Sequence, residues 1–421
     1  MQKLKFNIVD SIMGSGKSAW AFNYMYEQKD KKFIYVTPYL DEIQRLLYVR
    51  DEDGDVVKTE DGHFVGTKWY YERGFREPKH LGEGKLENLH DLLVKENNIA
   101  TTHALLKMCT QKTLDLIESG DYILILDEAL DAIELIDDMS IDDYNILLRA
   151  GNIKINEDKT ISWLTPNYEG IFWDFQRKCE NGTVVEIKKT RKVNLLIWNF
   201  NFKSFNVFKK IYIMTYLFDS SLLKYYFDIH KVSYRKWCIE NDNLVEFDKK
   251  KPYNKEHLGK LINIYDGNLN NIGEKRTALS VSWFRNNKHL RPKLRNNIYN
   301  YFKNIIQVNS SQSLWTTFKS FRRALSYTGY RQSFIPCNTK ATNEYSDRNV
   351  LAYCVNRFLS PDYENYFYKY KIKLNQDMYA LSEMIQWIWR SAIREEKPIH
   401  IYVPSRRMRT LLINWLNNEN L

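Results

Sequence analysis

The sequence has few cysteines, and none of them are spaced as in a metal or redox motif. The five cysteines are odd in number, and no two are separated by exactly two residues: Cys109, Cys179, Cys238, Cys337 and Cys354. Zinc sites and redox motifs commonly use Cys-x-x-Cys pairs, and secreted disulfide frameworks use even sets of cysteines. We therefore expect reduced thiols in a cytosolic protein, without a structural metal or disulfides.

Long hydrophobic runs are also missing. No apolar stretch of the 421 residues approaches the roughly 20 residues that a membrane-spanning helix needs. Residues 1–5 lead directly into an apolar segment, so we expect no signal peptide, and no internal repeat or low-complexity linker is visible. A hydrophobic content of 44% is ordinary for a soluble globular chain, and the length favours two domains.

Charge is distributed unevenly along the chain. Residues 1–220 hold 29 Lys and Arg against 35 Asp and Glu, whereas residues 221–421 hold 33 basic and 17 acidic groups. The net charge of +10 therefore combines an acidic first half with a strongly basic second half, which includes the basic stretch from Arg285 to Lys303. This asymmetry indicates that the second half binds a polyanion; the alternative is a solvated basic surface.

The clearest motif lies near the N-terminus, where an apolar segment leads into a Gly/Ser loop that ends in Gly16, Lys17 and Ser18. A strand, a glycine-rich turn and a helix in this order are typical of a nucleotide-binding P-loop. Gly14, Ser15 and Gly16 would surround phosphate oxygens with backbone N–H groups. Lys17 would reach the β- and γ-phosphates of ATP, and the Ser18 hydroxyl would hold Mg²⁺.

The motif departs from the full P-loop pattern in one place. The pattern expects Gly at position 11, where this chain has Ser11. The loop is closer to that of helicase-type motors, in which another small residue often replaces the first glycine. The alternative is an ordinary glycine turn with a solvated lysine.

A second motif follows the apolar run at residues 122–126, where Asp127 and Glu128 emerge. A continuous apolar run is typical of a strand buried on both faces of a parallel sheet. Two acids at the end of such a strand need a cation nearby. We expect Asp127 to hold Mg²⁺ and Glu128 to polarise the attacking water. Alone, an Asp-Glu pair could simply begin a loop.

A long segment of mixed character separates this motif from the next predicted strand at 211–215, and we interpret residues 140–205 as an insertion. Asp174, Glu186 and Lys188 faintly resemble the acid and lysine pattern of metal-dependent nucleases. A strand with one charged face explains Glu186 and Lys188 better.

The last part of the chain has a helical pattern over residues 380–394. Gln386, Arg390 and Arg394 are spaced four residues apart, which would place them on one helix face. An amphipathic helix with solvated arginines is the alternative. We also expect a helix at 350–358, a strand at 400–403 and a terminal helix from Ser405.

Together these motifs resemble those of superfamily 2 helicases and translocases, most closely a bacteriophage-encoded branch of DEAD-like helicases. The matching segments are 13–18 (motif I), 36–38 (motif Ia), 101–103 (a DNA-contacting motif), 127–130 (the DExx box), 215–218 (motif III), 341–345 (motif V) and 386–394 (motif VI). Motifs III, IV and V are loose. The Ser-Ala-Thr sequence of motif III is missing, and the second arginine of motif VI is four residues after the first instead of three.

The resemblance implies an α/β protein with two RecA-like domains, parallel sheets and a nucleotide cleft between them. It implies domains at 1–218 and 219–421, with Gln386 sensing the nucleotide and Arg390 and Arg394 acting as arginine fingers. The implied cofactors are ATP and Mg²⁺, and the implied partner is single-stranded or forked DNA in a host bacterial cytoplasm. The implied nucleic-acid contacts are Pro38, Thr101, Thr102, His103 and Thr342, although either threonine could instead cap a helix.

The sequence therefore favours an ATP-dependent helicase or translocase that acts on DNA during phage replication or recombination. The main alternative is a P-loop ATPase that works as a switch or loader without unwinding. Two further alternatives are a binding protein with an inactive nucleotide site and a helicase–nuclease fusion built on Glu186 and Lys188.

Overall fold

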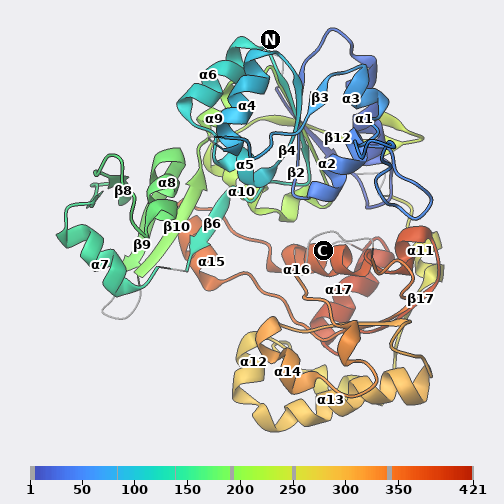
Figure 1. Cartoon of the computed structure of the whole chain (residues 1–421). Helices are drawn as coiled ribbons and strands as arrows, with labels where there is room; N and C mark the ends of the chain where they lie inside the picture. The colour runs from blue at the N-terminus through green and yellow to red at the C-terminus, as the bar shows by residue number, and fades with distance from the viewer. Residues whose placement is uncertain are drawn as a thin grey trace. The chain divides into compact units, whose positions relative to one another are not determined.

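The computed structural model describes residues 5–82, 84–137, 139–189, 194–248, 253–338 and 344–419. These residues form two compact units (Figure 1). The first unit comprises Met1–Ser11, Ser15–Phe247 and Glu364–Ile372, and the second comprises Ile12–Gly14, Asp248–Tyr363 and Lys373–Leu421. None of the helices in the described ranges is both long enough and apolar enough to span a bilayer.

The first unit is built on an eight-stranded sheet in the order β13-β12-β1-β11-β5-β2-β4-β3. All neighbouring strands are parallel except the β12–β13 pair. The strands are β1 (Phe6–Asp10), β2 (Phe33–Thr37), β3 (Phe75–Arg76), β4 (Asn98–Thr102), β5 (Ile123–Asp127), β11 (Lys210–Thr215), β12 (Tyr234–Glu240) and β13 (Asn243–Glu246). The strands predicted at 122–126 and 211–215 are confirmed as β5 and β11.

Helices cover both faces of this sheet. Residues of α1 and α2 pack with Val9, Tyr35 and Met214 on one face, whereas Phe6 meets Phe205 of α9 and Phe227 of α10 on the other. The helices are α1 (Lys17–Glu27), α2 (Leu40–Leu47), α3 (Lys68–Tyr71), α4 (Lys85–Val94), α5 (His103–Lys107), α6 (Gln111–Ser119), α9 (Lys203–Asn206) and α10 (Leu222–Ile229).

The main segment of the first unit extends to Phe247, beyond the boundary at residue 218 that the sequence suggested. The reason lies in strand pairing, because β12 joins β1 in parallel, with Phe6 opposite Tyr234, and β13 then pairs with β12. The segment 219–247 therefore completes the first sheet instead of opening the second domain.

A separate antiparallel sheet lies within the first unit, between β5 and β11. Its order is β6-β10-β9-β8-β7, and it overlaps the insertion expected at 140–205. Its elements are β6 (Ile133–Ile136), α7 (Ile141–Arg149), β7 (Ile153–Ile155), β8 (Thr160–Trp163), α8 (Trp173–Asn181), β9 (Gly182–Lys189) and β10 (Asn194–Phe200). A later helix, α15 (Pro361–Tyr368), returns to this unit, where the Tyr366 hydroxyl donates to Asn199 Oδ1 at 2.7 Å.

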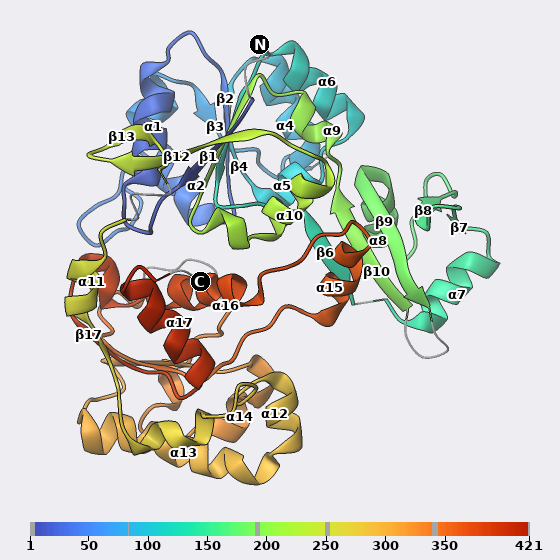
Figure 2. The same cartoon turned by 180° about the vertical axis from the view of Figure 1, so that it is seen from behind.

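The second unit has a parallel four-stranded sheet in the order β14-β17-β16-β15. Figures 1 and 2 show α12–α14 on one side of this sheet and α16 and α17 on the other. The strands are β14 (Ile262–Ile264), β15 (Ser313–Thr316), β16 (Val350–Tyr353) and β17 (Ile399–Tyr402). The main helices are α11 (Glu256–Leu261), α12 (Val281–Asn286), α13 (Arg291–Asn300), α14 (Arg322–Leu325), α16 (Gln376–Ile388) and α17 (Arg406–Leu416).

One predicted element of the second unit is wrong and two are confirmed. Residues 350–358 contain the strand β16 instead of a helix, and this strand pairs with both β15 and β17. All four of its residues are buried, and periodicity cannot separate so short an apolar run from a buried helix. The strand near 400–403 and the terminal helix beyond Ser405 are present.

Candidate active site

The loop between β1 and α1 has the backbone of a phosphate-binding loop. Gly14 has φ +81° and Gly16 has φ +84°, in the left-handed region where a Cβ costs about 1 kcal/mol or more. A Cβ on Gly16 would also lie 3.3 Å from Asp242 Oδ1. Within the described ranges, the buried Ser15 Oγ has no hydrogen-bond partner. These features fit a loop that closes around an anion with its N–H groups.

Lys17 lies at the first position of α1 and is held close to the loop. Its Nζ donates to the backbone oxygen of Ser11 at 2.5 Å. Burial lowers the pKa of Lys17 to about 8, and the nearby carboxylates of Asp127, Asp10 and Glu128 oppose that shift. A lysine ammonium in this position is a point charge suited to phosphate oxygens.

Ser18 and Asp127 come together although 109 residues separate them. The Ser18 hydroxyl donates to Asp127 Oδ2 at 3.1 Å. The strand order explains the approach, because β1 and β5 both flank β11 in parallel register and end at the same edge of the sheet. A hydroxyl and a carboxylate are oxygen ligands that Mg²⁺ accepts, so the pair fits the predicted metal site.

Tyr35 also contacts this carboxylate, and the sequence analysis missed it. Its hydroxyl donates to Asp127 Oδ2 at 2.5 Å from the middle of β2, the strand next to β5. The side chain is fully buried. This burial and the nearby Asp127 carboxylate raise the pKa of Tyr35 well above its usual value. The only signal in the sequence is a tyrosine in the middle of a short, mostly apolar strand.

Glu128 leaves β5 with a strained backbone. Its φ is +76°, which is uncommon for a residue with a side chain. Its N–H donates to the backbone oxygen of Met214 on β11 at 2.9 Å. Such outliers persist where the surrounding structure enforces them, often at functional sites.

Asp10, the last residue of β1, connects the P-loop strand to the loop after β11. Its Oδ2 accepts from the Phe218 N–H at 3.1 Å and lies 3.5 Å from Lys236 Nζ, which also pairs with Asp219 at 2.7 Å. Burial raises the pKa of Asp10, and Lys236 opposes this shift. The sequence analysis assigned no role to Asp10 or Lys236, and its domain boundary at residue 218 separated the two.

The predicted nucleic-acid contacts follow β2 and β4, whose carboxyl ends lie at the same edge as Asp127. Pro38 is half-buried after β2. Thr102 caps α5, since its hydroxyl accepts from the Leu105 N–H at 3.4 Å. Thr101 and His103 are buried, at 5% and 7% exposed. Thr342 lies outside the described residues.

Gln386, Arg390 and Arg394 do not share one helix face, so that prediction is wrong. The helix α16 ends at Ile388, and Arg394 lies in a separate short 3-10 helix, Ala392–Glu395. The Ser391 hydroxyl donates to the Ile388 oxygen at 2.7 Å, and such local bonds compete with helix continuation. Arg390 is buried at 6% exposed, whereas Arg394 is exposed and Gln386 is half-buried.

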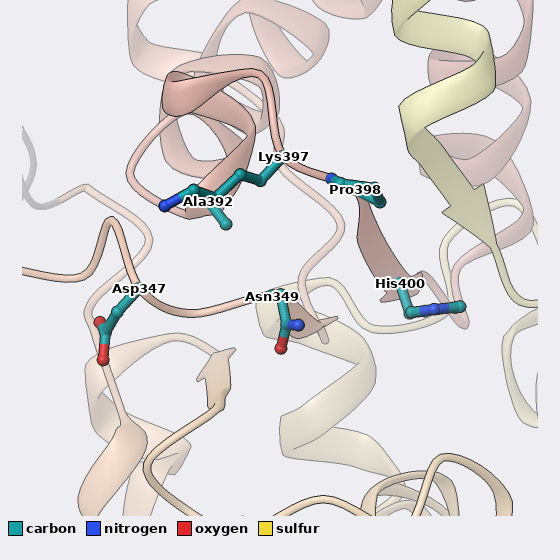
Figure 3. A pocket seen from close by; sticks show the side chains of 6 residues that line it. All are labelled: Asp347, Asn349, Ala392, Lys397, Pro398 and His400. Carbon is teal, nitrogen blue, oxygen red and sulfur yellow. The ribbon is translucent and has the colours of Figure 1, made fainter.

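A pocket of about 460 Å³ lies at the start of β16 and β17 (Figure 3). It is lined by Asp347, Asn349, Ala392, Lys397, Pro398 and His400. Ligands of open parallel sheets bind beyond the carboxyl ends of the strands. This pocket adjoins the amino ends and therefore lies outside the predicted site.

Both acidic residues of the weak nuclease pattern have structural partners. Asp174 pairs with Arg177 and Lys178 on its own helix, and Glu186 accepts from the Tyr144 hydroxyl at 3.0 Å. In the part of the chain that the structure describes, no three His, Cys, Asp or Glu side chains gather as a metal site would require. The strand interpretation of Glu186 is confirmed, because it lies in β9.

The fold as a whole is similar to that of a solved protein. The structure of S. tokodaii Xpd4 matches with a TM-score of 0.51 at 11% identity, over 98% of this chain and 94% of that chain. The predicted fold class is confirmed: the chain has an α/β fold with parallel sheets in two RecA-like units.

Two sequence comparisons identify relatives. A family model described as the YonV C-terminal Rossmann-like domain matches residues 256–416. The SPbeta prophage-derived uncharacterized protein YonV of Bacillus subtilis (strain 168) is 40% identical over 440 residues, covering 100% of both chains. Because this identity extends over the full length of both proteins, the chain belongs to the YonV family.

Proposed function

We propose that the chain is an ATP-dependent helicase or translocase that acts on DNA during phage replication or recombination in the host cytoplasm. The observation that carries the proposal is the convergence of Lys17, Ser18 and Asp127 behind a loop with left-handed glycines. The helicase-like fold and the prophage-derived relative support it. The basic second half adds a reason to expect a polyanionic partner.

In this proposal, Gly14, Ser15 and Gly16 bind phosphate oxygens through their N–H groups, with Lys17 at the terminal phosphates. Ser18 and Asp127 would hold Mg²⁺, which would neutralise phosphate charge when bound. Glu128 accepts the proton of the attacking water.

The remaining predicted residues belong to other segments of the chain than the P-loop. Gln386 senses the nucleotide, and the guanidinium groups of Arg390 and Arg394 stabilise charge that develops on the transferred phosphoryl group. The nucleic-acid strand contacts Pro38, Thr101, Thr102, His103 and Thr342. Coupled opening and closing of the two units would then move the protein along the strand.

The test is ATP hydrolysis by the wild type and by Glu128→Gln, each with and without single-stranded DNA. Loss of a general base lowers turnover by about 10²–10⁴, while nucleotide binding persists because the P-loop is unchanged. Glu118→Gln, an exposed change on α6, is the matched control. Strong DNA stimulation that disappears in Glu128→Gln supports a motor.

An ATP hydrolysis rate that does not change when single-stranded DNA is added would instead favour the switch or loader. That alternative keeps the same P-loop chemistry but needs no movement along a strand. No hydrolysis under any condition would contradict both functions and leave a binding protein with an inactive nucleotide site.

A further inference from the structure

A long segment of the second unit contains basic residues and no acidic ones. Between Glu274 and Glu344, residues 275–343 include 13 Lys and Arg and neither Asp nor Glu. The described part of this segment contains α12, α13 and α14, and short helical turns at Lys288–Leu290 and Lys319–Phe321. We refer to these five elements as the basic helical layer.

The basic helical layer turns its apolar side inward. Leu294, Ile298 and Phe284 pack in one core cluster with Trp315 of β15 and Tyr402 of β17. The layer therefore covers one face of the four-stranded sheet, as Figures 1 and 2 show. Its charged side chains are left on the outer side, because the inner side is occupied by the core.

Aromatic packing joins the elements of the layer into one surface. The rings of Phe284 and Phe321 stack with centroids 4.7 Å apart, and the Arg291 guanidinium donates to the Phe284 oxygen at 2.6 Å and 3.0 Å. Arg285 follows Phe284 in sequence, and Arg322 follows Phe321. The basic residues of α12 and α14 therefore belong to neighbouring turns on the same side of the unit.

The cations of this surface are exposed and, within the described ranges, have no carboxylate partner. The exposed members of the five elements are Arg285, Lys288, Lys293, Lys319, Arg322 and Arg323. Among the described residues, none of these six forms an ion pair with a carboxylate. A surface with charge of one sign creates a potential that attracts a polyanion.

Exposed rings are scarce on the same surface. In the described part of 275–338, the large hydrophobic side chains left exposed are Ile305 at 45% and Tyr327 at 43%. Single-strand binding relies on aromatic platforms that stack with bases, whereas a duplex hides its bases and presents its phosphates. The combination of many cations and few exposed rings fits the outside of a duplex.

We propose that the basic helical layer binds the phosphate backbone of double-stranded nucleic acid. This proposal rests on the proposed function for the nature of the substrate, a nucleic acid. It adds that part of the substrate is a duplex and that the basic helical layer is the surface that binds it. Contact with phosphates alone would give binding that is independent of sequence and strongly dependent on salt.

The experiment measures binding of the full chain to a fluorescent duplex and to its single strand, by polarisation, across a salt series without nucleotide. The test variant is Arg285→Gln/Arg322→Gln/Arg323→Gln. The matched control, Lys58→Gln/Lys79→Gln/Lys95→Gln, removes three exposed charges from the first unit. We expect the test variant to lose duplex affinity at least about tenfold, and the slope of log affinity against log salt to fall by about 0.9 per lost contact.

Three outcomes would overturn the proposal. The first is an unchanged duplex affinity and salt slope in the test variant, and the second is an equal loss in the control variant. The third is a loss confined to single strands, or to vesicles that contain anionic lipid. Because binding is measured without ATP, a wild type that binds duplex through this layer but hydrolyses no ATP would contradict only the proposed function.

Discussion

The Tyr35 hydroxyl donates a hydrogen bond of 2.5 Å to Oδ2 of Asp127. The same oxygen accepts from Ser18 at 3.1 Å, so one carboxylate oxygen is held from two sides. The two donors lie on different elements, β2 and α1. By fixing Oδ2, they also fix the direction of the other carboxylate oxygen, Oδ1. A hydrogen bond to a charged acceptor is worth about 1.5–3 kcal/mol, which is enough to fix the orientation of the carboxylate.

Tyr35→Phe should raise the Mg²⁺ concentration needed for half-maximal ATP hydrolysis, by about tenfold if one such bond of about 1.5 kcal/mol is lost. The ring remains, so the packing against Phe22 persists. The measurement is a Mg²⁺ titration of the hydrolysis rate at saturating ATP. Tyr24→Phe is the control, because that hydroxyl accepts from Tyr212 instead of facing Asp127. Equal Mg²⁺ requirements in both variants would contradict the role of Tyr35.

Asp10→Asn should change how stability depends on pH. Burial raises the pKa of Asp10 above its ordinary 3.8, so the folded state binds the proton more tightly than the unfolded state. The contribution of this carboxyl to stability is then greatest at low pH and declines as pH rises from 3.8 through the raised value. The titratable groups that interact with it are Lys236, Asp219, Lys17, Tyr234 and Cys238.

The free energy of unfolding, from urea titrations at several pH values, should therefore show a specific trend. The wild-type value minus the Asp10→Asn value should fall through the acidic range and become constant above the raised pKa. A difference that rises with pH would mean that Lys236 outweighs burial at this carboxyl.

Arg407→Met should destabilise the second unit strongly. The Arg407 side chain is buried and donates to Asp377 Oδ1 at 2.7 Å, to Asn356 Oδ1 at 2.9 Å and to the Arg357 oxygen at 2.7 Å. Removing one member of such a buried charged network costs about 3–5 kcal/mol. Urea unfolding followed by tryptophan fluorescence measures the loss.

The adjacent Arg406→Met is the matched control for this substitution. The Arg406 side chain is 67% exposed and lies 3.9 Å from Glu274, so its removal should change stability by less than about 0.5 kcal/mol. Similar losses in both variants would contradict a role for the buried network.

Gly273→Ala and Gly259→Ala should change stability in opposite directions. A Cβ on Gly273 would lie 1.9 Å from the Pro404 backbone oxygen, whereas nothing lies within 4 Å of a Cβ on Gly259. The first change forces backbone apart and should cost about 1–3 kcal/mol. The second, inside α11, should gain about 0.5–1 kcal/mol. Differential scanning fluorimetry compares the two, and a gain for Gly273→Ala would contradict the close approach.

Local patterns in the sequence were sufficient for the elements that carry the P-loop and the Asp127 strand. A continuous apolar run before a Gly-Lys-Ser loop has few structural solutions, and both strands and the first helix lie where expected. The helix predicted over 350–358 failed because a short apolar run is compatible with either secondary structure. The helix predicted over 380–394 was cut short at Ile388, where Ser391 bonds to the backbone.

The sequence by itself determined that this protein has a Gly-Lys-Ser loop between a strand and a helix, two acids directly after a buried strand and a basic second half. These features depend only on neighbouring residues and on composition. Only the tertiary structure decided which distant residues meet. Strand order placed Tyr35 against Asp127 and Lys236 against Asp10, and packing on one sheet face gathered the basic helical layer. Strand order and face depend on the burial of the whole sheet, and no local pattern encodes them.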